Sequence, residues 1–171
     1  MRRVLVAVVV LAACRGGGGA AVPPGTGVLD ANAAVVHVVD GDTIDVTVGG
    51  ARERVRLTGV DTPEVAHPGT PERPGNAAEC FADAASAFVA ALIPVGTPLR
   101  LERDVVSRDD YGRLLAYVYR ADDGVFVNYE LVRQGYARPL SIAPNVTHRD
   151  RFVDAARLAD DADAGLWGAC P

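Results

Sequence analysis

The fold is decided by residues 33–60, which read AAVVHVVDGDTIDVTVGGARERVRLTGV. Short runs rich in valine are separated by two turn signals, Asp-Gly after Val39 and Gly-Gly after Val48. Within 43–48 apolar and polar residues alternate, which predicts one buried face and one face in water. The pattern predicts a meander of three antiparallel strands at Val35–Val39, Thr43–Val48 and Arg52–Leu57.

The rest of the chain adds two strands and three helices to this meander. The strands are predicted at Leu99–Arg103 and Leu114–Tyr119, and the helices at Ala77–Leu92, at Val127–Gln134 and from Thr147 onwards. The prolines and glycines of 63–75 predict a surface loop. Five short strands with helices among them predict an α+β fold, a five-stranded antiparallel Greek-key barrel of the OB type with three helices.

The first thirty residues have the composition of an export signal followed by a linker. Residues 1–13 combine a basic start with a short apolar run, as secretory signals do, and the run is too short to span a bilayer. Leu11-Ala-Ala-Cys14 resembles the lipobox of bacterial lipoproteins, in which the cysteine becomes the first mature residue and carries lipid. A plain secretory signal with an unrelated cysteine is the alternative.

We therefore expect an exported protein that is lipid-anchored to the cell envelope through Cys14, on the extracytoplasmic side. Residues 14–30 are rich in glycine and proline and predict a flexible linker. The remaining stretch, 31–171, is long enough for one domain with one core.

Charge argues against tight storage of nucleic acid. The chain has 17 basic residues, all arginine, against 22 acidic ones, a net charge of −5 that becomes −7 once 1–13 and its two arginines are removed. Polyanions favour basic surfaces, so any nucleic acid should be engaged weakly and during catalysis. A bound cation would offset part of this negative charge.

Three short segments carry the chemistry: 40–43 (DGDT), 56–64 (RLTGVDTPE) and 110–113 (DYGR). Their carboxylates can bind a hard divalent cation through oxygen, and their arginines can hold a phosphate through forked hydrogen bonds. A metal, a carboxylate base and two arginines are what metal-assisted hydrolysis of a phosphodiester requires.

In this order and spacing the three segments resemble the staphylococcal nuclease family. The resemblance covers about 36–167 and continues in 115–119 (LAYVY), 127–135 (VNYELVRQG) and the Thr147-His148 pair. It implies an OB-fold and a monomeric Ca²⁺-dependent nuclease that cuts DNA and RNA with little sequence specificity and leaves 3′-phosphates. The alternative is a catalytically weak OB-fold module that binds nucleic acid or protein.

The metal site that the resemblance implies is made of oxygen atoms. It assigns Ca²⁺ to the Asp42 and Asp61 carboxylates and to the Thr62 carbonyl, and it makes Asp40 a turn residue that supports them. Oxygen ligands alone suit Ca²⁺ better than Zn²⁺. Because Asp42 begins one strand and Asp61 ends the next, an antiparallel pairing can bring them together.

The resemblance assigns catalysis to Arg56, Glu64 and Arg113. Glu64 would orient or deprotonate the attacking water, while Arg56 and Arg113 would bind the phosphate and stabilise its developing charge. Residue parity places Arg56 on the same side of its strand as Arg52 and Arg54, which we expect to be solvated. The strand pattern alone therefore does not separate Arg56 from its neighbours.

The nucleotide pocket is where the chain departs from the family. Tyr111 matches a tyrosine of the family's pocket, but Asp110 stands where the best-known member has a phosphate-facing lysine. Ser141-Ile-Ala143 occupies the stretch that carries two pocket tyrosines there. We expect weaker base stacking and a higher KM, with the catalytic set unchanged.

Two cysteines follow Cys14. In an exported chain, the pair Cys80 and Cys170 predicts a disulfide, and two buried free thiols are the alternative.

Overall fold

A computed structural model describes residues 29–66 and 77–171. The predicted leader, Cys14 and nearly all of the linker lie outside the described residues, as does 67–75 of the predicted surface loop. The elements are β1 (Ala33–Val38), β2 (Thr43–Val48), β3 (Ala51–Leu57), β4 (Gly59–Asp61), α1 (Ala82–Leu92), β5 (Pro98–Glu102), β6 (Leu114–Arg120), α2 (Val127–Arg133), β7 (Arg138–Leu140), α3 (Arg149–Asp161) and α4 (Leu166–Ala169). Within the described part, no helix has the length and apolar character that crossing a membrane requires.

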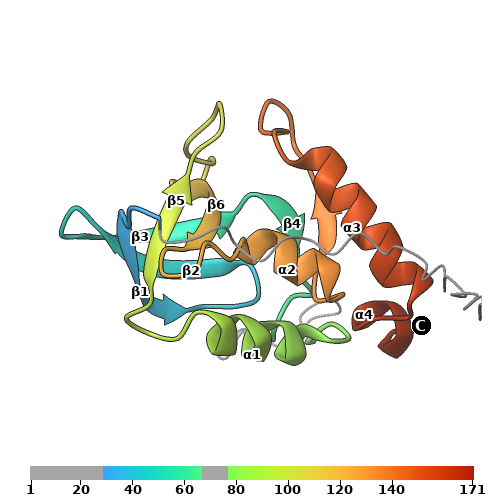
Figure 1. The fold of residues 1–171 in the computed structure, drawn as a ribbon. Coiled ribbons are helices and arrows are strands. Elements are labelled where there is room, and N and C mark those ends of the chain that lie inside the picture. Colours follow the sequence, from blue (N-terminus) through green and yellow to red (C-terminus); the bar gives the residue numbers. More distant parts are fainter. Residues whose placement is uncertain (1–28, 67–76) are drawn as a thin grey trace, which may run out of the picture.

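Five strands close into the predicted barrel in the order β1-β2-β3-β6-β5 (Figure 1). Four of its pairings are antiparallel, as expected, whereas β3 and β6 run parallel, with Val55 beside Leu114 and Leu57 beside Ala116. Strand direction cannot alternate all the way around a closed ring with an odd number of strands, so one parallel pair is unavoidable. The α+β barrel of the OB type is confirmed, with this one parallel pairing.

A second, two-stranded sheet leaves the barrel at Gly59, where the chain turns from β3 into β4. Gly59 has φ of 83°, and a Cβ there would lie 2.4 Å from the Phe152 ring, so only glycine fits. β4 then pairs antiparallel with β7, placing Asp61 opposite Arg138. This sheet was not predicted, and it carries Asp61 away from the end of β3.

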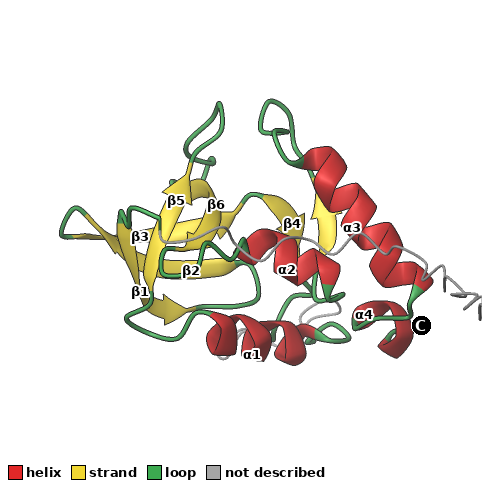
Figure 2. Cartoon of the chain, in the orientation of Figure 1, coloured by secondary structure: helices red, strands yellow, loops and turns green. Residues whose placement is uncertain are grey.

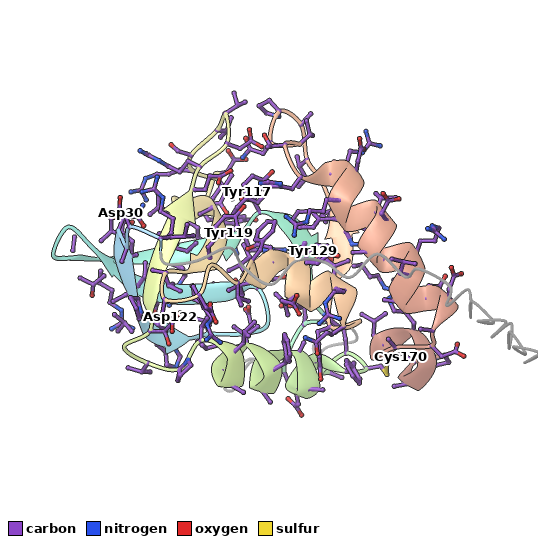
Figure 3. All side chains as sticks on the ribbon, viewed as in Figure 1. Asp30, Tyr117, Tyr119, Asp122, Tyr129 and Cys170 are labelled. Atoms are coloured by element: carbon purple, nitrogen blue, oxygen red, sulfur yellow. A yellow bond between two sulfur atoms is a disulfide. The ribbon has the colours of Figure 1, made fainter. Side chains whose placement is uncertain are left out.

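The core lies between the barrel and α2, which is packed between β6 and α3 (Figure 2). Inward residues of the strands meet aromatic side chains there, and Tyr117 and Phe152 are the largest that are fully buried. Tyr117, Tyr119 and Tyr129 point into this layer from β6 and α2 (Figure 3).

Two helices begin later than predicted. The segment before α1 does not become helical, because the Glu79 N–H donates to the Glu64 carbonyl and Phe81 has φ of 74°. The last helix begins at Arg149, and the Thr147 N–H just before it donates to Asp104 Oδ2 (3.0 Å). The second predicted helix ends at Arg133, close to its expected end.

The predicted disulfide joins Cys80 and Cys170, whose Cα atoms are 5.8 Å apart. It fastens the end of the chain beside α4 to the segment that leads into α1 (Figure 3). The two predicted cysteines thus form a bond that spans 90 residues of sequence.

Candidate active site

Arg56 is the centre of the site and is held from four directions. Its NH1 donates to the carbonyls of Leu57 and Val60 (2.8 Å each), which form the corner between β3 and β4. Its NH2 lies 2.9 Å from Asp61 Oδ1 and 3.0 Å from Asp42 Oδ2. Only 15% of the side chain is exposed, so the guanidinium is fixed before any ligand arrives.

Arg56 therefore differs from Arg52 and Arg54, which parity alone could not show. Those two side chains are 63% and 53% exposed and form ion pairs with Asp45 on β2. All three arginines are on the outer face of β3. The corner at Gly59 places the Leu57 and Val60 carbonyls and the Asp61 carboxylate against Arg56, and not against Arg52 or Arg54.

Asp42 precedes β2 in a tight turn. Its N–H donates to Asp40 Oδ1 (3.0 Å), which places Asp40 in the turn role assigned to it. Asp42 Oδ2 accepts the Thr62 N–H (3.0 Å), and a Cβ at Gly41 would lie 2.6 Å from Thr62 Oγ1. Burial raises the pKa of Asp42 to about 6, against the opposing effects of the Arg56 charge and the Thr62 N–H.

The two carboxylates assigned to a metal do converge. Asp42 and Asp61 each have an oxygen within 3.0 Å of the same Arg56 nitrogen, so those oxygens are less than twice that distance apart. Asp42 is buried, and half of the Asp61 side chain is exposed. A cation would offset both the repulsion between them and the cost of burying the Asp42 charge, so the pair fits a hard divalent ion.

Within the described residues no group of three or more histidine, cysteine or acidic side chains has metal-binding geometry. The two carboxylates would therefore need a backbone carbonyl, such as that of Thr62, and water to complete the coordination. Thr62 is buried and its N–H points at Asp42.

Glu64 lies two residues beyond Thr62 and is exposed. Its backbone is held by Glu79: the Glu64 N–H donates to Glu79 Oε2 (3.1 Å), and the Glu79 N–H donates to the Glu64 carbonyl (2.9 Å). Among described residues, the Glu64 carboxylate forms no ion pair with Arg56 or Arg113. Its side chain is exposed to water, while its backbone is tied to the residue next to Cys80.

Arg113 comes from the loop that enters β6. Its Nε donates to Asp109 Oδ2 (2.7 Å), and Asp109 Oδ1 accepts the backbone N–H groups of Arg113 and Tyr111. Burial acts to raise the pKa of Asp109, but the bonds from Arg113 and Tyr111 bring it below its usual value. Asp109 therefore stays ionised and fixes both the turn and the guanidinium.

Arg56 and Arg113 face the same groove, which has a volume of about 480 Å³. Tyr111 also lines it and is 86% exposed, with its ring centroid 5.4 Å from the Arg113 guanidinium carbon. Asp110 and Ile142 lie on its wall. By the resemblance, the family's best-known member has a lysine and two tyrosines in these stretches, and this chain lacks them. Among the described residues that line this groove, Tyr111 is the one aromatic side chain.

Three supporting residues were not predicted. Asn128 is fully buried; it accepts the Val118 N–H (2.9 Å) and donates to the Thr58 carbonyl (2.9 Å), which joins β6 to the corner that holds Arg56. Asp109 and Glu79 hold Arg113 and Glu64 in the ways described above. Only Asp109 had a local signal, because an aspartate two residues before a Tyr-Gly turn often accepts backbone N–H bonds.

Comparison with known proteins gives matches over most of the chain. Residues 54–169 match the family model described as Staphylococcal nuclease homologue. The thermonuclease of Staphylococcus intermedius is 37% identical over 142 residues, which cover 83% of this chain and 79% of that protein. The thermonuclease of Staphylococcus hyicus is 35% identical over 133 residues, covering 78% and 73%. The SPbeta prophage-derived endonuclease YokF of Bacillus subtilis is 37% identical over 133 residues, covering 77% of this chain and 42% of that protein.

Proposed function

The chain belongs to the staphylococcal nuclease family, and from this premise we propose that it is a Ca²⁺-dependent phosphodiesterase that hydrolyses DNA and RNA. We propose little sequence specificity and 3′-phosphorylated products. The observation that carries the proposal is the Arg56 centre: one partly buried guanidinium that faces two convergent carboxylates and shares a groove with Arg113.

Each residue of the site has its own role in the proposed reaction. Arg56 and Arg113 bind the non-bridging oxygens of the scissile phosphate and stabilise the charge that grows there in the transition state. Glu64 orients the attacking water and accepts its proton, and Tyr111 offers a face to the neighbouring base. Ca²⁺ held by Asp42, Asp61 and the Thr62 carbonyl would supply positive charge at the phosphate and a more acidic bound water.

Export is the second part of the proposal, and it rests on sequence outside the described residues. Residues 1–13 act as a lipoprotein signal, and Cys14 carries the lipid. The linker 14–30 holds the domain 31–171 away from the membrane. The domain is a monomer. Replacement of Cys14 by serine should release the protein from membranes or block its processing. Wild-type protein that is entirely free of membrane would contradict the anchor.

DNA degradation tests the nuclease proposal. The purified protein should degrade DNA with Ca²⁺, lose that activity in EGTA, and regain it when Ca²⁺ is restored. Glu64→Gln keeps the shape of the side chain and removes its basicity, so kcat should fall by about 10²-fold or more while binding of DNA is retained. Full activity in EGTA would contradict the Ca²⁺ requirement, and unchanged turnover of Glu64→Gln would remove Glu64 from the mechanism.

A further inference from the structure

A second group of arginines lies beside the active-site groove on the outer face of the barrel. Arg52, Arg54 and Arg113 surround an open depression of about 430 Å³ that Asp45, Tyr111 and Gly112 complete. We call this depression the lateral groove. Arg52 and Arg54 are not among the catalytic residues described above.

The lateral groove is ordered and carries excess positive charge. Arg54 donates to Asp45 through Nε (2.8 Å) and NH2 (3.2 Å), and Arg52 donates through NH2 (2.8 Å). The Asp45 side chain is only 5% exposed beneath them. The hydrogen bond from Arg54 lowers the pKa of Asp45 to about 2, so the carboxylate stays ionised. Among the groups in direct contact, two guanidinium groups share one carboxylate, which leaves one positive charge and several N–H donors facing solvent, while the Asp40 charge acts on Arg54 from outside these hydrogen bonds.

The sheet places this cluster directly in line with the active site. Arg54 is opposite Asp45 on β2, and the parallel pairing of Val55 with Leu114 places Arg54 next to Arg113 on the other side. Tyr111 and Arg113 line both grooves, so the two depressions adjoin. The two grooves therefore form one path over the strands β2, β3 and β6.

We propose that the lateral groove binds the phosphodiester backbone of a single nucleic-acid strand next to its scissile phosphate. The proposal rests on the nuclease function above. Outward side chains two residues apart on a strand are separated by about 7 Å, a spacing similar to that of phosphates along an extended polynucleotide. With the reacting phosphate at Arg56 and Arg113, the neighbouring base stacks on Tyr111 and the following phosphates reach Arg54 and Arg52.

The groove also explains how an acidic chain can engage a polyanion. The net charge of −5 provides no general attraction, so binding must depend on local positive charge. A strand long enough to reach the lateral groove gains contacts that a dinucleotide cannot make. Tight binding and its salt dependence should therefore appear only with longer strands.

Binding of a fluorescent thymidine dodecanucleotide in EDTA, followed by anisotropy, tests the proposal without turnover. The triple variant Asp45→Ser/Arg52→Ser/Arg54→Ser removes the cluster and leaves no buried carboxylate unpaired. We expect it to raise Kd by about tenfold or more. The slope of log Kd against log salt concentration should fall by about 1.4, at about 0.7 for each phosphate contact on a single strand. Cleavage of a thymidine dinucleotide should keep its kcat and KM.

Arg157→Ser is the matched control. Arg157 is on α3, is as exposed as Arg52 (63%), and forms one ion pair with Asp161. Its substitution changes the net charge by the same single unit as the triple variant, so it should leave Kd within about twofold. If the triple variant does not fold, Arg52→Ser alone still leaves Asp45 paired with Arg54, and it should lower the salt slope by about 0.7.

The outcomes separate this proposal from the nuclease function. If the triple variant, or Arg52→Ser in its place, binds the dodecanucleotide as Arg157→Ser does, the lateral groove is refuted. A second outcome is that the wild type cleaves the dinucleotide but binds the long strand no more tightly than the short one. That result would refute the lateral groove and leave the nuclease function unaffected. Binding that depends on Arg52 and Arg54, without any cleavage in Ca²⁺, supports the groove and refutes the nuclease.

Discussion

Replacing both Cys80 and Cys170 with serine should cost stability and also turnover, because the disulfide is connected to Glu64. The bond closes a loop that spans 90 residues of sequence. In the chain-entropy model a loop of this length is worth about 4.6 kcal/mol at 25 °C. A domain of this size has about 5–15 kcal/mol of stability in total, so the double variant should be marginally folded at 37 °C.

The effect on turnover follows from the residue beside Cys80. Glu79 holds the Glu64 backbone through two hydrogen bonds, of 3.1 and 2.9 Å. Without the disulfide, the segment that carries Glu79 loses its tie to the end of the chain, and Glu64 is less well placed toward the water. Displacement of a catalytic group by about 1 Å can cost about 10²-fold in rate. In the proposed mechanism Glu64 acts in the transition state, so kcat should fall while KM changes little.

Urea unfolding of the oxidised wild type and of the serine double variant gives the difference in their free energies of unfolding by linear extrapolation. Kinetics at a temperature where both proteins are folded measure kcat and KM. Glu79→Ala removes the side-chain acceptor with the disulfide intact, so it should reproduce the loss of kcat at nearly wild-type stability. A stability loss below about 1 kcal/mol, together with unchanged kcat in both variants, would refute the reasoning.

Three further outcomes are expected. Arg113→Ala should lower kcat by about 10²-fold or more in a folded protein, because in the proposed mechanism Arg113 stabilises transition-state charge; near-wild-type turnover would exclude that role. Asn128→Ala should lower the free energy of unfolding in urea by about 2–4 kcal/mol, since the Thr58 carbonyl and the Val118 N–H lose their buried partner; a loss below 1 kcal/mol would contradict this. The lowered pKa of Asp45 contributes stability above its ordinary value of 3.8, and that stability is lost as pH falls toward about 2. Asp45→Asn should therefore remove an acid-dependent term of at most about 2 kcal/mol, reduced because the paired arginines are exposed, and an identical acid-unfolding profile would disprove it.

The barrel could be predicted because its strands obey a two-residue period. Ile44 and Val46 are fully buried, as the alternation in 43–48 required. The same alternation predicts a polar face in water, but Asp45 on that face is buried too. Arginine side chains from β3 are long enough to cover it. A pattern of polar and apolar residues does not show how far a neighbouring side chain extends.

The supports of the candidate site could not be predicted from the sequence, and the roles assigned to its residues remain predictions. Resemblance identified Arg56, but its distinctive environment comes from the corner at Gly59, which brings the Val60 carbonyl and Asp61 back to the guanidinium. Asn128 and Glu79 act over 70 and 15 residues of sequence, respectively, so no local motif marks them. Hydrogen bonds between distant segments depend on tertiary packing, which periodicity and turn signals do not encode.

The acidic composition of the chain is compatible with a polyanionic substrate because of where its carboxylates lie. Around the two grooves, Asp42 and Asp61 hold Arg56, Asp109 holds Arg113, and Asp45 holds the arginines of the lateral groove. Each free arginine side chain has about 2 kcal/mol of rotamer entropy to lose when it binds. A carboxylate that orients the guanidinium in advance reduces that loss at the moment a phosphate arrives. These four carboxylates thus prepare the arginines for phosphate, even though they lower the net charge.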